Sequence, residues 1–311
     1  MTASPAHAAL YSFTSHTFTS CGTSGRTGPA QATCRSSYMS TWDDLDSNFI
    51  VVNGIQYWTV PATGKYYIDA YGAGGGGNLA GGGARIADTF NLSEGEVIRI
   101  LVGQTAIANS GTSAVGGGGG TFVVRSPFNS NGSILIVAGG GAGTETGVTQ
   151  YSGAHASITT SGNDGINGAS ATASGAGGTA GNGGGTAASQ NAGGGGGGFF
   201  SDGTRNTNWD NNGGSAFVNG GYGALGGTTN ISSNSGGFGG GGAAAGKGAG
   251  GGAGGGGGYS GGGGADNVSN GAGGGGGSYF ANGLNLNRIT TVDAVAENTN
   301  GYVTITFLSP P

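Results

Sequence analysis

Three aspartates, Asp43, Asp44 and Asp46, form a compact acidic stretch and are the first side chains of this sequence that could do chemistry. Carboxylates at such close spacing could bind calcium or a basic partner. The simpler alternative is a solvated loop, because a short acidic run is soluble without any ligand. We therefore treat these aspartates as candidate binding residues and predict no metal site.

Side chains suited to catalysis are sparse in this chain. His7, His16 and His155 are scattered, and no acid or cysteine stands beside them in the sequence. Acid–base catalysis and metal binding need such groups close together. No paired acids and no Ser/His/Asp arrangement stand out either. We predict that the protein is not an enzyme and uses no cofactor.

Two glycine-rich motifs resemble ligand-binding loops but lack essential parts. Residues 241–248 (GGAAAGKG) have glycine where a phosphate-binding loop needs Ser or Thr, and no strand–loop–helix pattern surrounds them. Residues 261–269 (GGGGADNVS) match a calcium-binding nonapeptide once, whereas that motif works in tandem copies. We expect neither nucleotide nor calcium at these places.

Asparagine, serine and threonine cluster with aromatic residues between the glycine runs, in segments 206–212, 219–222 and 230–234. Amides beside an exposed ring suit the recognition of a sugar or a protein surface. The alternative is that these segments are simply hydrophilic loop tips. The candidate binding residues are Asn206, Trp209, Asn211, Tyr222 and Asn230.

The two cysteines, Cys21 and Cys34, enclose a short loop. A metal site would want more ligands, and a redox pair would have the spacing C-x-x-C. We predict a disulfide that closes the loop in an oxidising compartment. On the loop-entropy estimate it stabilises the fold by about 3 kcal/mol.

Glycine dominates the second half of the chain, above all residues 236–278, and accounts for 80 of 311 residues, roughly four times the usual share. Such runs are either flexible linkers or extended helices, with about three residues per turn, that hydrogen-bond to one another. Ordering a glycine costs about 1–2 kcal/mol and a backbone hydrogen bond returns about 1 kcal/mol, so a bundle needs a folded platform. Large rings end most runs and favour the ordered bundle: Phe199, Phe200, Phe238, Tyr259, Tyr279 and Phe280.

The platform is predicted from short alternating segments rich in Val, Ile and aromatic residues, which are typical of a β-sandwich. Turn signals separate several of them, including Asn53-Gly54 and Asn131-Gly132, each of which predicts a hairpin. Residues 301–308 (GYVTITFL) alternate regularly and should pair with the early strands. We find no helical periodicity of useful length. The predicted strands are 11–19, 49–52, 55–60, 65–71, 84–90, 96–102, 121–125, 133–138, 290–295 and 301–308.

The segments 21–34, with its start CGTSGRTGP, and 54–64 (GIQYWTVPATG) resemble the glycine-rich ectodomain of the anaplastic lymphoma kinase and leukocyte tyrosine kinase receptors. The resemblance continues in the same order through 71–74, 101–104, 116–123 and 137–141. It also extends to glycine-rich structural or tail proteins of bacteriophages. The chain departs from the receptors in having no kinase, no membrane span and no cysteine after Cys34, so we do not expect receptor signalling.

The resemblance implies a jelly roll like that of tumour necrosis factor, with an inserted bundle of polyglycine II helices and a surface that binds a protein ligand. We therefore expect an all-β fold in which residues 1–138 and 283–311 form the jelly-roll sandwich. Residues 139–282 would be the inserted bundle. Jelly rolls of this kind often form trimers, so a homo-oligomer is an expectation that the resemblance raises.

The amino-acid composition limits the classes of partner that the protein could bind. Charged residues are 7% of the chain, against about a quarter in typical proteins, and 14 acids outnumber 9 basic residues. No basic patch for nucleic acid and no apolar stretch for membrane insertion is predicted. The first residues (MTASPAHAALYSF) have no basic start and no apolar core of a signal peptide, so the chain either begins near a mature end or leaves its cell by lysis.

The function predicted from these observations is that of a non-enzymatic structural and adhesive protein on a virion surface or tail. Its rigid glycine scaffold would present loops to a protein or glycan of the host surface, alongside other virion proteins. The alternative is a secreted or cell-surface module that binds a protein ligand, as in the receptors. Either function places the protein on a virion surface or outside the cell.

Overall fold

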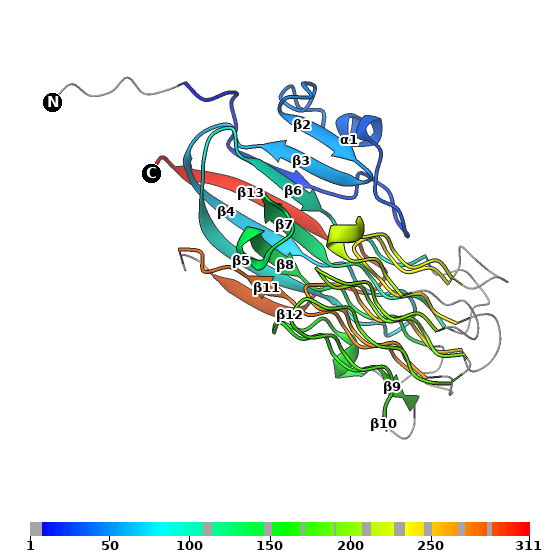
Figure 1. Cartoon of the computed structure of the whole chain (residues 1–311). Helices are drawn as coiled ribbons and strands as arrows, with labels where there is room; N and C mark the ends of the chain where they lie inside the picture. Colours follow the sequence, from blue (N-terminus) through cyan, green and yellow to red (C-terminus); the bar gives the residue numbers. More distant parts are fainter. Residues whose placement is uncertain are drawn as a thin grey trace.

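A computed structural model gives the fold and describes residues 8–107, 114–145, 151–168, 172–189, 191–206, 213–226, 234–245, 251–266, 271–284 and 288–311. Two antiparallel β-sheets form one end of the molecule, and extended glycine-rich segments continue from them toward the other end (Figure 1). The predicted all-β sandwich is therefore confirmed at the level of its two packed sheets.

The five-stranded sheet brings the two ends of the chain together. Its strands, in order, are β1 (Ser15–Phe18), β13 (Tyr302–Ser309), β4 (Gly64–Tyr71), β5 (Gly83–Leu92) and β12 (Ile289–Val295). On β13, Val303 and Ile305 are fully buried, while Thr304 and Thr306 on the other face are partly exposed. The predicted alternation of this strand and its pairing with early strands are confirmed.

The six-stranded sheet contains, in order, β11 (Tyr279–Phe280), β8 (Ile134–Ala138), β7 (Thr121–Arg125), β6 (Val97–Leu101), β3 (Ile55–Thr59) and β2 (Phe49–Val52). Asn53 and Gly54 join β2 to β3 with φ angles of 51° and 81°, as a tight hairpin turn requires. The hairpin predicted at Asn53-Gly54 is therefore confirmed. A separate two-stranded ribbon pairs β9 (Ile166–Asn167) with β10 (Thr172–Ala173).

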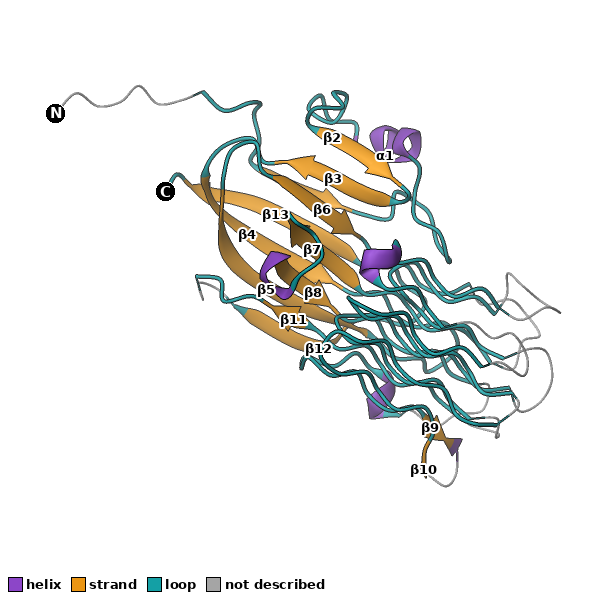
Figure 2. Ribbon diagram, viewed as in Figure 1, coloured by secondary structure: helices purple, strands orange, loops and turns teal. Residues whose placement is uncertain are grey.

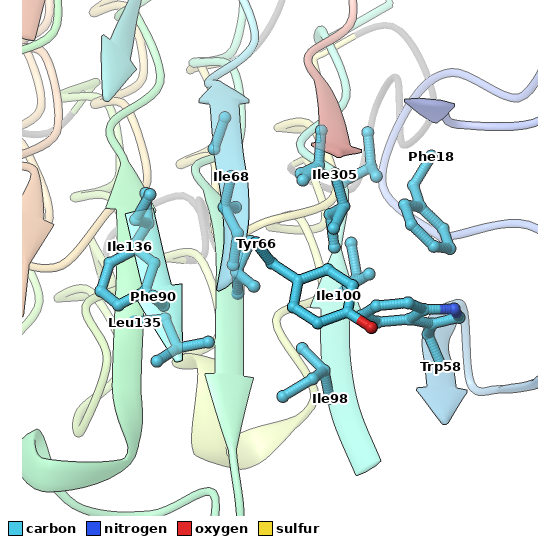
Figure 3. Packing of buried hydrophobic residues seen from close by; sticks show 14 of the residues in the cluster. Phe18, Trp58, Tyr66, Ile68, Phe90, Ile98, Ile100, Leu135, Ile136 and Ile305 are labelled. Atoms are coloured by element: carbon cyan, nitrogen blue, oxygen red, sulfur yellow. The ribbon is translucent and has the colours of Figure 1, made fainter. Parts of the chain in front are cut away.

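The core between the sheets is a cluster of aromatic and branched aliphatic side chains (Figure 3). Phe18 of β1, Trp58 of β3 and Tyr66 of β4 are among its largest members, and all three are fully buried. The Trp58 and Tyr66 rings lie edge to face with centroids 5.8 Å apart. Because these rings come from both sheets, the core joins the sheets into one sandwich.

Rings that end glycine runs cover part of the outer face of the six-stranded sheet. Phe199, Phe238 and Tyr259 are buried in one cluster with Leu101 of β6 and Phe122 of β7. The strands β7 and β8 are thus buried on both faces, which explains their nearly continuous apolar sequences. The large rings at the ends of these runs thus attach the glycine segments to the sandwich.

The glycine runs hydrogen-bond to one another through their backbones. The Gly118 amide donates to the Gly141 carbonyl at 2.8 Å, Gly140 donates to Gly257 at 2.8 Å, and Gly257 donates back to Gly118 at 2.9 Å. Three runs far apart in the sequence therefore satisfy one another's polar groups without belonging to any sheet. Figure 2 shows these segments as loops that lie side by side. The prediction that the runs pair instead of forming a flexible linker holds for the described residues.

One helix was not predicted, and one turn differs from its predicted form. Helix α1 (Gln31–Tyr38) begins after Ala30 and ends at Met39, whose φ of 50° is left-handed. Its eight residues carry no clear apolar stripe, and Cys34 alone among them is buried, so periodicity could not reveal it. Asn131-Gly132 lies in the 3₁₀ helix η1 (Asn131–Ser133) and not in a tight hairpin turn, because eight residues separate β7 from β8. Two further 3₁₀ turns are η2 (Ser152–Ala154) and η4 (Phe217–Asn219).

Candidate binding site

The glycine runs end far from the sandwich in a polar region that we call the remote end. Each run that has its ring against the six-stranded sheet must finish at the opposite side, because the runs are extended. The Asn191 carbonyl accepts from the Gly252 amide at 2.8 Å, and the Gly252 carbonyl accepts from Ala245 at 2.9 Å. The Ala244 amide donates to Asn234 at 2.8 Å, so four runs meet here. The remote end comprises the described residues Glu145, Ser189, Asn191, Asn206, Asn234, Ala245, Asp266 and Gly271.

Polar side chains tie the runs together at the remote end. The Asn234 amide group donates to the Ala245 carbonyl at 3.0 Å and is almost fully buried. The Glu145 carboxylate accepts from the Gly271 amide at 3.4 Å, while the Glu145 amide donates to the Gly271 carbonyl at 3.2 Å. The Ser189 hydroxyl donates to the Asp266 carboxylate. These bonds fix the bases of the segments that connect one run to the next.

Asn206 is part of this framework and is not an exposed contact. It is 3% exposed, and its amide group donates to the carbonyl of Ser189 at 2.8 Å. The prediction of an exposed binding residue is therefore corrected: the Asn206 amide is used within the fold, where it joins this segment to Ser189. Trp209, Asn211 and Asn230 lie outside the described residues, so their role in binding stays a prediction.

Tyr222 lies at the other end of the bundle, near the sandwich. Its half-buried ring packs edge to face on Phe238 with centroids 6.1 Å apart. Its carbonyl accepts from the Ser215 amide at 2.9 Å. The structure therefore does not bring Tyr222 together with Asn206, although both were predicted as binding-loop residues.

The acidic stretch is not a uniformly solvated loop. Asp43 is fully buried, whereas Asp44 and Asp46 are exposed. Arg35 of α1 donates from Nε to the Asp43 carbonyl at 2.8 Å and forms an ion pair with Asp46 at 2.7 Å. This arginine draws the loop onto the sandwich, which corrects the simple loop interpretation for Asp43.

The Asp43 carboxylate is in an unfavourable position for a charge. Its oxygens lie near the amides of Ser40 and of Asp43 itself, but form no hydrogen bond of ordinary geometry with any described residue. Burial therefore raises the pKa of this carboxyl. Across the described part of the chain, His, Cys, Asp and Glu side chains nowhere gather in a group of three that could hold a metal ion.

The disulfide predicted between Cys21 and Cys34 is confirmed, with Cα atoms 4.9 Å apart. Both cysteines are buried, and Cys34 lies within α1. The bond therefore fastens the helix to the segment that leaves β1. The Tyr38 hydroxyl at the end of the helix adds a second attachment by donating to Oε1 of Gln56 at 2.6 Å.

The two described histidines, His16 and His155, make contacts within the fold. His16 on β1 lies in a box of rings, with centroids 4.4 Å from Tyr38, 4.7 Å from Phe18 and 4.9 Å from Trp42. Burial lowers the pKa of His16 to about 4. His155 accepts from the Gly82 amide at 3.0 Å, and His7 lies outside the described residues.

The polar residues Glu145, Ser189 and Asp266 were missed as members of the site. A signal was available in the sequence: Glu145 and Asp266 are isolated acids that stand just after a glycine run ends, in a region with few charges. The remote end as a whole offers amides, carbonyls and hydroxyls at positions fixed by these hydrogen bonds, an arrangement suited to binding a polar surface.

Among the described residues, no helix is long and apolar enough to cross a bilayer.

Comparison with known proteins supports part of the resemblance. No protein-family model matches the chain. The chain is similar to the leukocyte tyrosine kinase receptor of Mus musculus, with 39% identity over 98 residues. This similarity covers 28% of the chain and 10% of the receptor, so the chain spans about a tenth of that relative's length. The resemblance to phage tail proteins stays a prediction.

Proposed function

We propose that this protein is a non-enzymatic extracellular binding module. In this proposal a jelly-roll sandwich carries a bundle of polyglycine II helices, formed largely by residues 139–282, and the remote end of the bundle contacts a protein or glycan partner. The observation that carries the proposal is that buried polar side chains, such as Asn206 and Asn234, hydrogen-bond the ends of neighbouring glycine runs to one another.

The advantage of this arrangement is preorganisation. Asn206 is held by the Ser189 carbonyl, and Gly214, two residues beyond the segment 207–212, donates to Gly195 and accepts from Gly203. A segment fixed at both ends loses less conformational entropy when it binds. Residues 207–212 (TNWDNN) supply an aromatic ring and amides, which are suited to sugars and protein surfaces.

The extracellular location is supported by the disulfide and by the partial similarity to a receptor. Disulfides persist mainly in oxidising compartments. A finer version of the proposal places the protein on a virion surface or tail, and its support is the sequence resemblance alone. The trimer expected for a jelly roll of this kind is tested by sedimentation of the purified chain.

The proposal is tested by replacing residues 207–212 with a Gly/Ser segment of equal length. The labelled protein is applied to a glycan array, to intact bacterial cells and to secreted animal proteins. We expect binding to be lost in the variant, at an unchanged unfolding temperature, and to be kept when the exposed turn 93–95 is replaced instead. Binding to bacterial cells would favour the virion function, and binding to a secreted protein would favour the receptor-like module.

The result that contradicts the proposal is also clear. If exchanges of 207–212, 227–233 and 246–250, made separately and together, leave every detected binding unchanged, the remote end is not a binding surface.

A further inference from the structure

A second surface, on the outer face of the six-stranded sheet, contains an arginine clamped between two aromatic rings. Arg99 of β6 lies opposite Tyr57 of β3 and Val124 of β7 in the sheet register. Its guanidinium carbon is 4.9 Å from the centroid of the Tyr57 ring and 4.0 Å from that of Phe128. Both distances are within the range of a cation–π interaction. The rings therefore fix the plane of the guanidinium.

Among the described residues, Arg99 has no counter-ion, unlike Arg85 and Arg125 on the strands and Arg288 next to β12. Arg85 pairs with Asp69, Arg125 with Glu96 and Arg288 with Asp88, each at 2.7 Å. Within the described part of the chain, no carboxylate pairs with Arg99, and its Nε is buried without a hydrogen-bond partner. A partly buried charge without a partner is unfavourable, and an apolar side chain would serve this packing position better.

The second ring of the clamp is placed at an energetic cost. Phe128 has a φ of 71°, in the left-handed region that bulky residues rarely adopt, and its amide donates to the Arg125 carbonyl at 3.0 Å. Backbone strain of this kind tends to occur where a site must be preorganised. Two independent unfavourable features, the unpaired cation and the strained backbone, thus meet at one point.

We propose that Arg99, Tyr57 and Phe128 form a binding site for a carboxylate on a protein ligand. Only Nε of Arg99 is both buried and without a partner, so the two Nη groups remain accessible. They would donate two parallel hydrogen bonds to the carboxylate. The flanking rings would pack on an apolar side chain next to that acid. Aromatic residues and arginine are the types most often found at the energetic centre of a protein interface.

The surroundings favour an acidic peptide over other anions. A nucleic acid or a sulfated polymer requires a patch of cations, whereas this chain has 9 basic residues against 14 acids. The two rings of the clamp, Tyr57 and Phe128, are partly buried and pack against an apolar cluster. Such surroundings suit the side chain of a hydrophobic residue better than the hydroxyl groups of a sugar.

The test follows the Nε–H signal of Arg99 by NMR in the intact chain. The probe is the dipeptide N-acetyl-Phe-Glu-amide, its neutral match is N-acetyl-Phe-Gln-amide, and glucuronate serves as an acidic sugar. We expect the Glu dipeptide to shift the Arg99 signal in a saturable way, and neither of the other two to do so at equal concentration. The Arg99→Lys variant keeps the charge but loses the planar, two-pronged guanidinium. Its binding is followed by the ring signals of Tyr57 and Phe128, and it should bind the Glu dipeptide at least about tenfold more weakly.

The matched control is Arg85→Lys, because Arg85 also lies over a ring, Tyr71 at 5.2 Å, but already has its carboxylate. This variant should bind the probe as the wild-type chain does. The proposal is overturned if the wild-type Arg99 signal does not shift, if the Gln dipeptide shifts it equally, or if Arg99→Lys binds unchanged. Equal binding of glucuronate would overturn the assignment to a protein ligand. The wild-type titration decides the question even if a variant is unstable.

Discussion

Alanine at Gly196 should destabilise the protein strongly, because this residue lies in contact with three other glycine runs. Its amide donates to the Gly262 carbonyl at 2.8 Å, and its own carbonyl accepts from the Gly184 amide at 2.8 Å. A Cβ atom at this position would lie 2.0 Å from the Gly256 carbonyl oxygen and 2.6 Å from its carbon. The Gly256 run cannot avoid this overlap by a rotamer change, since the clash is with backbone.

The magnitude follows from what must move. Overpacking of a dense interior costs about 1–3 kcal/mol. Separating the runs also weakens the two hydrogen bonds of Gly196, each worth about 1 kcal/mol net. The free energy of unfolding should therefore fall by roughly 3–5 kcal/mol. With an unfolding entropy of about 2.1 cal/mol/K per residue, this lowers the unfolding temperature by about 5–8 °C.

The assay is differential scanning calorimetry of Gly196→Ala beside a matched variant in the same bundle, Gly185→Ala. A Cβ at Gly185 meets its nearest atom, the Ala176 amide nitrogen, at 3.2 Å, so small shifts can relieve it. Replacing glycine also restricts the unfolded chain, which stabilises by about 0.4–1 kcal/mol and offsets that strain. We expect Gly185→Ala to change the unfolding temperature little. Equal unfolding temperatures for the two variants would refute the close packing of the runs.

Two further predictions concern the sandwich. The free energy of unfolding of the double variant Cys21→Ala/Cys34→Ala, measured with denaturant, should be lower by about 3 kcal/mol, because the unfolded chain gains conformational freedom. An unchanged unfolding midpoint would show that α1 needs no covalent attachment. The lowered pKa of His16, about 4 against an ordinary 6.5, means that the unfolded chain takes up the proton first. The His16 contribution to stability is therefore complete above about pH 6.5 and is lost as the pH falls toward about 4. In the variant His16→Phe, the free energy of unfolding should therefore depend less on pH between about 4 and 6.5 than in the wild-type chain. If the two proteins show parallel profiles of unfolding free energy against pH, the burial of His16 is contradicted.

Strands were predictable from the sequence because their signals are local. The alternation in 301–308 and the turn residues Asn53-Gly54 fix which side chains face inward and where a strand reverses. Helix α1 gave no such signal. It is held by the disulfide of Cys34 and by the hydrogen bond from Tyr38 to Gln56, contacts with residues outside the helix.

The candidate site was predictable only in outline. Rings at the ends of glycine runs indicated an ordered bundle, but the runs are nearly identical in composition, so the sequence cannot tell which run lies beside which. The burial of Asn206 depends on Ser189 belonging to a neighbouring run, and the burial of Asp43 depends on Arg35 of α1. Both are consequences of tertiary packing that no local pattern records.

Amide hydrogen exchange across residues 193–198, 252–258 and 273–277 tests the central claim most directly. In these segments the amides of Gly196, Gly256 and Gly276 donate to carbonyls of other runs at 2.8–3.0 Å. If the runs form an ordered bundle, these amides exchange many times more slowly than in an unfolded chain, with protection comparable to that of β7 and β8. Exchange at the rate of an unfolded chain throughout these segments, while β7 and β8 stay protected, would contradict it.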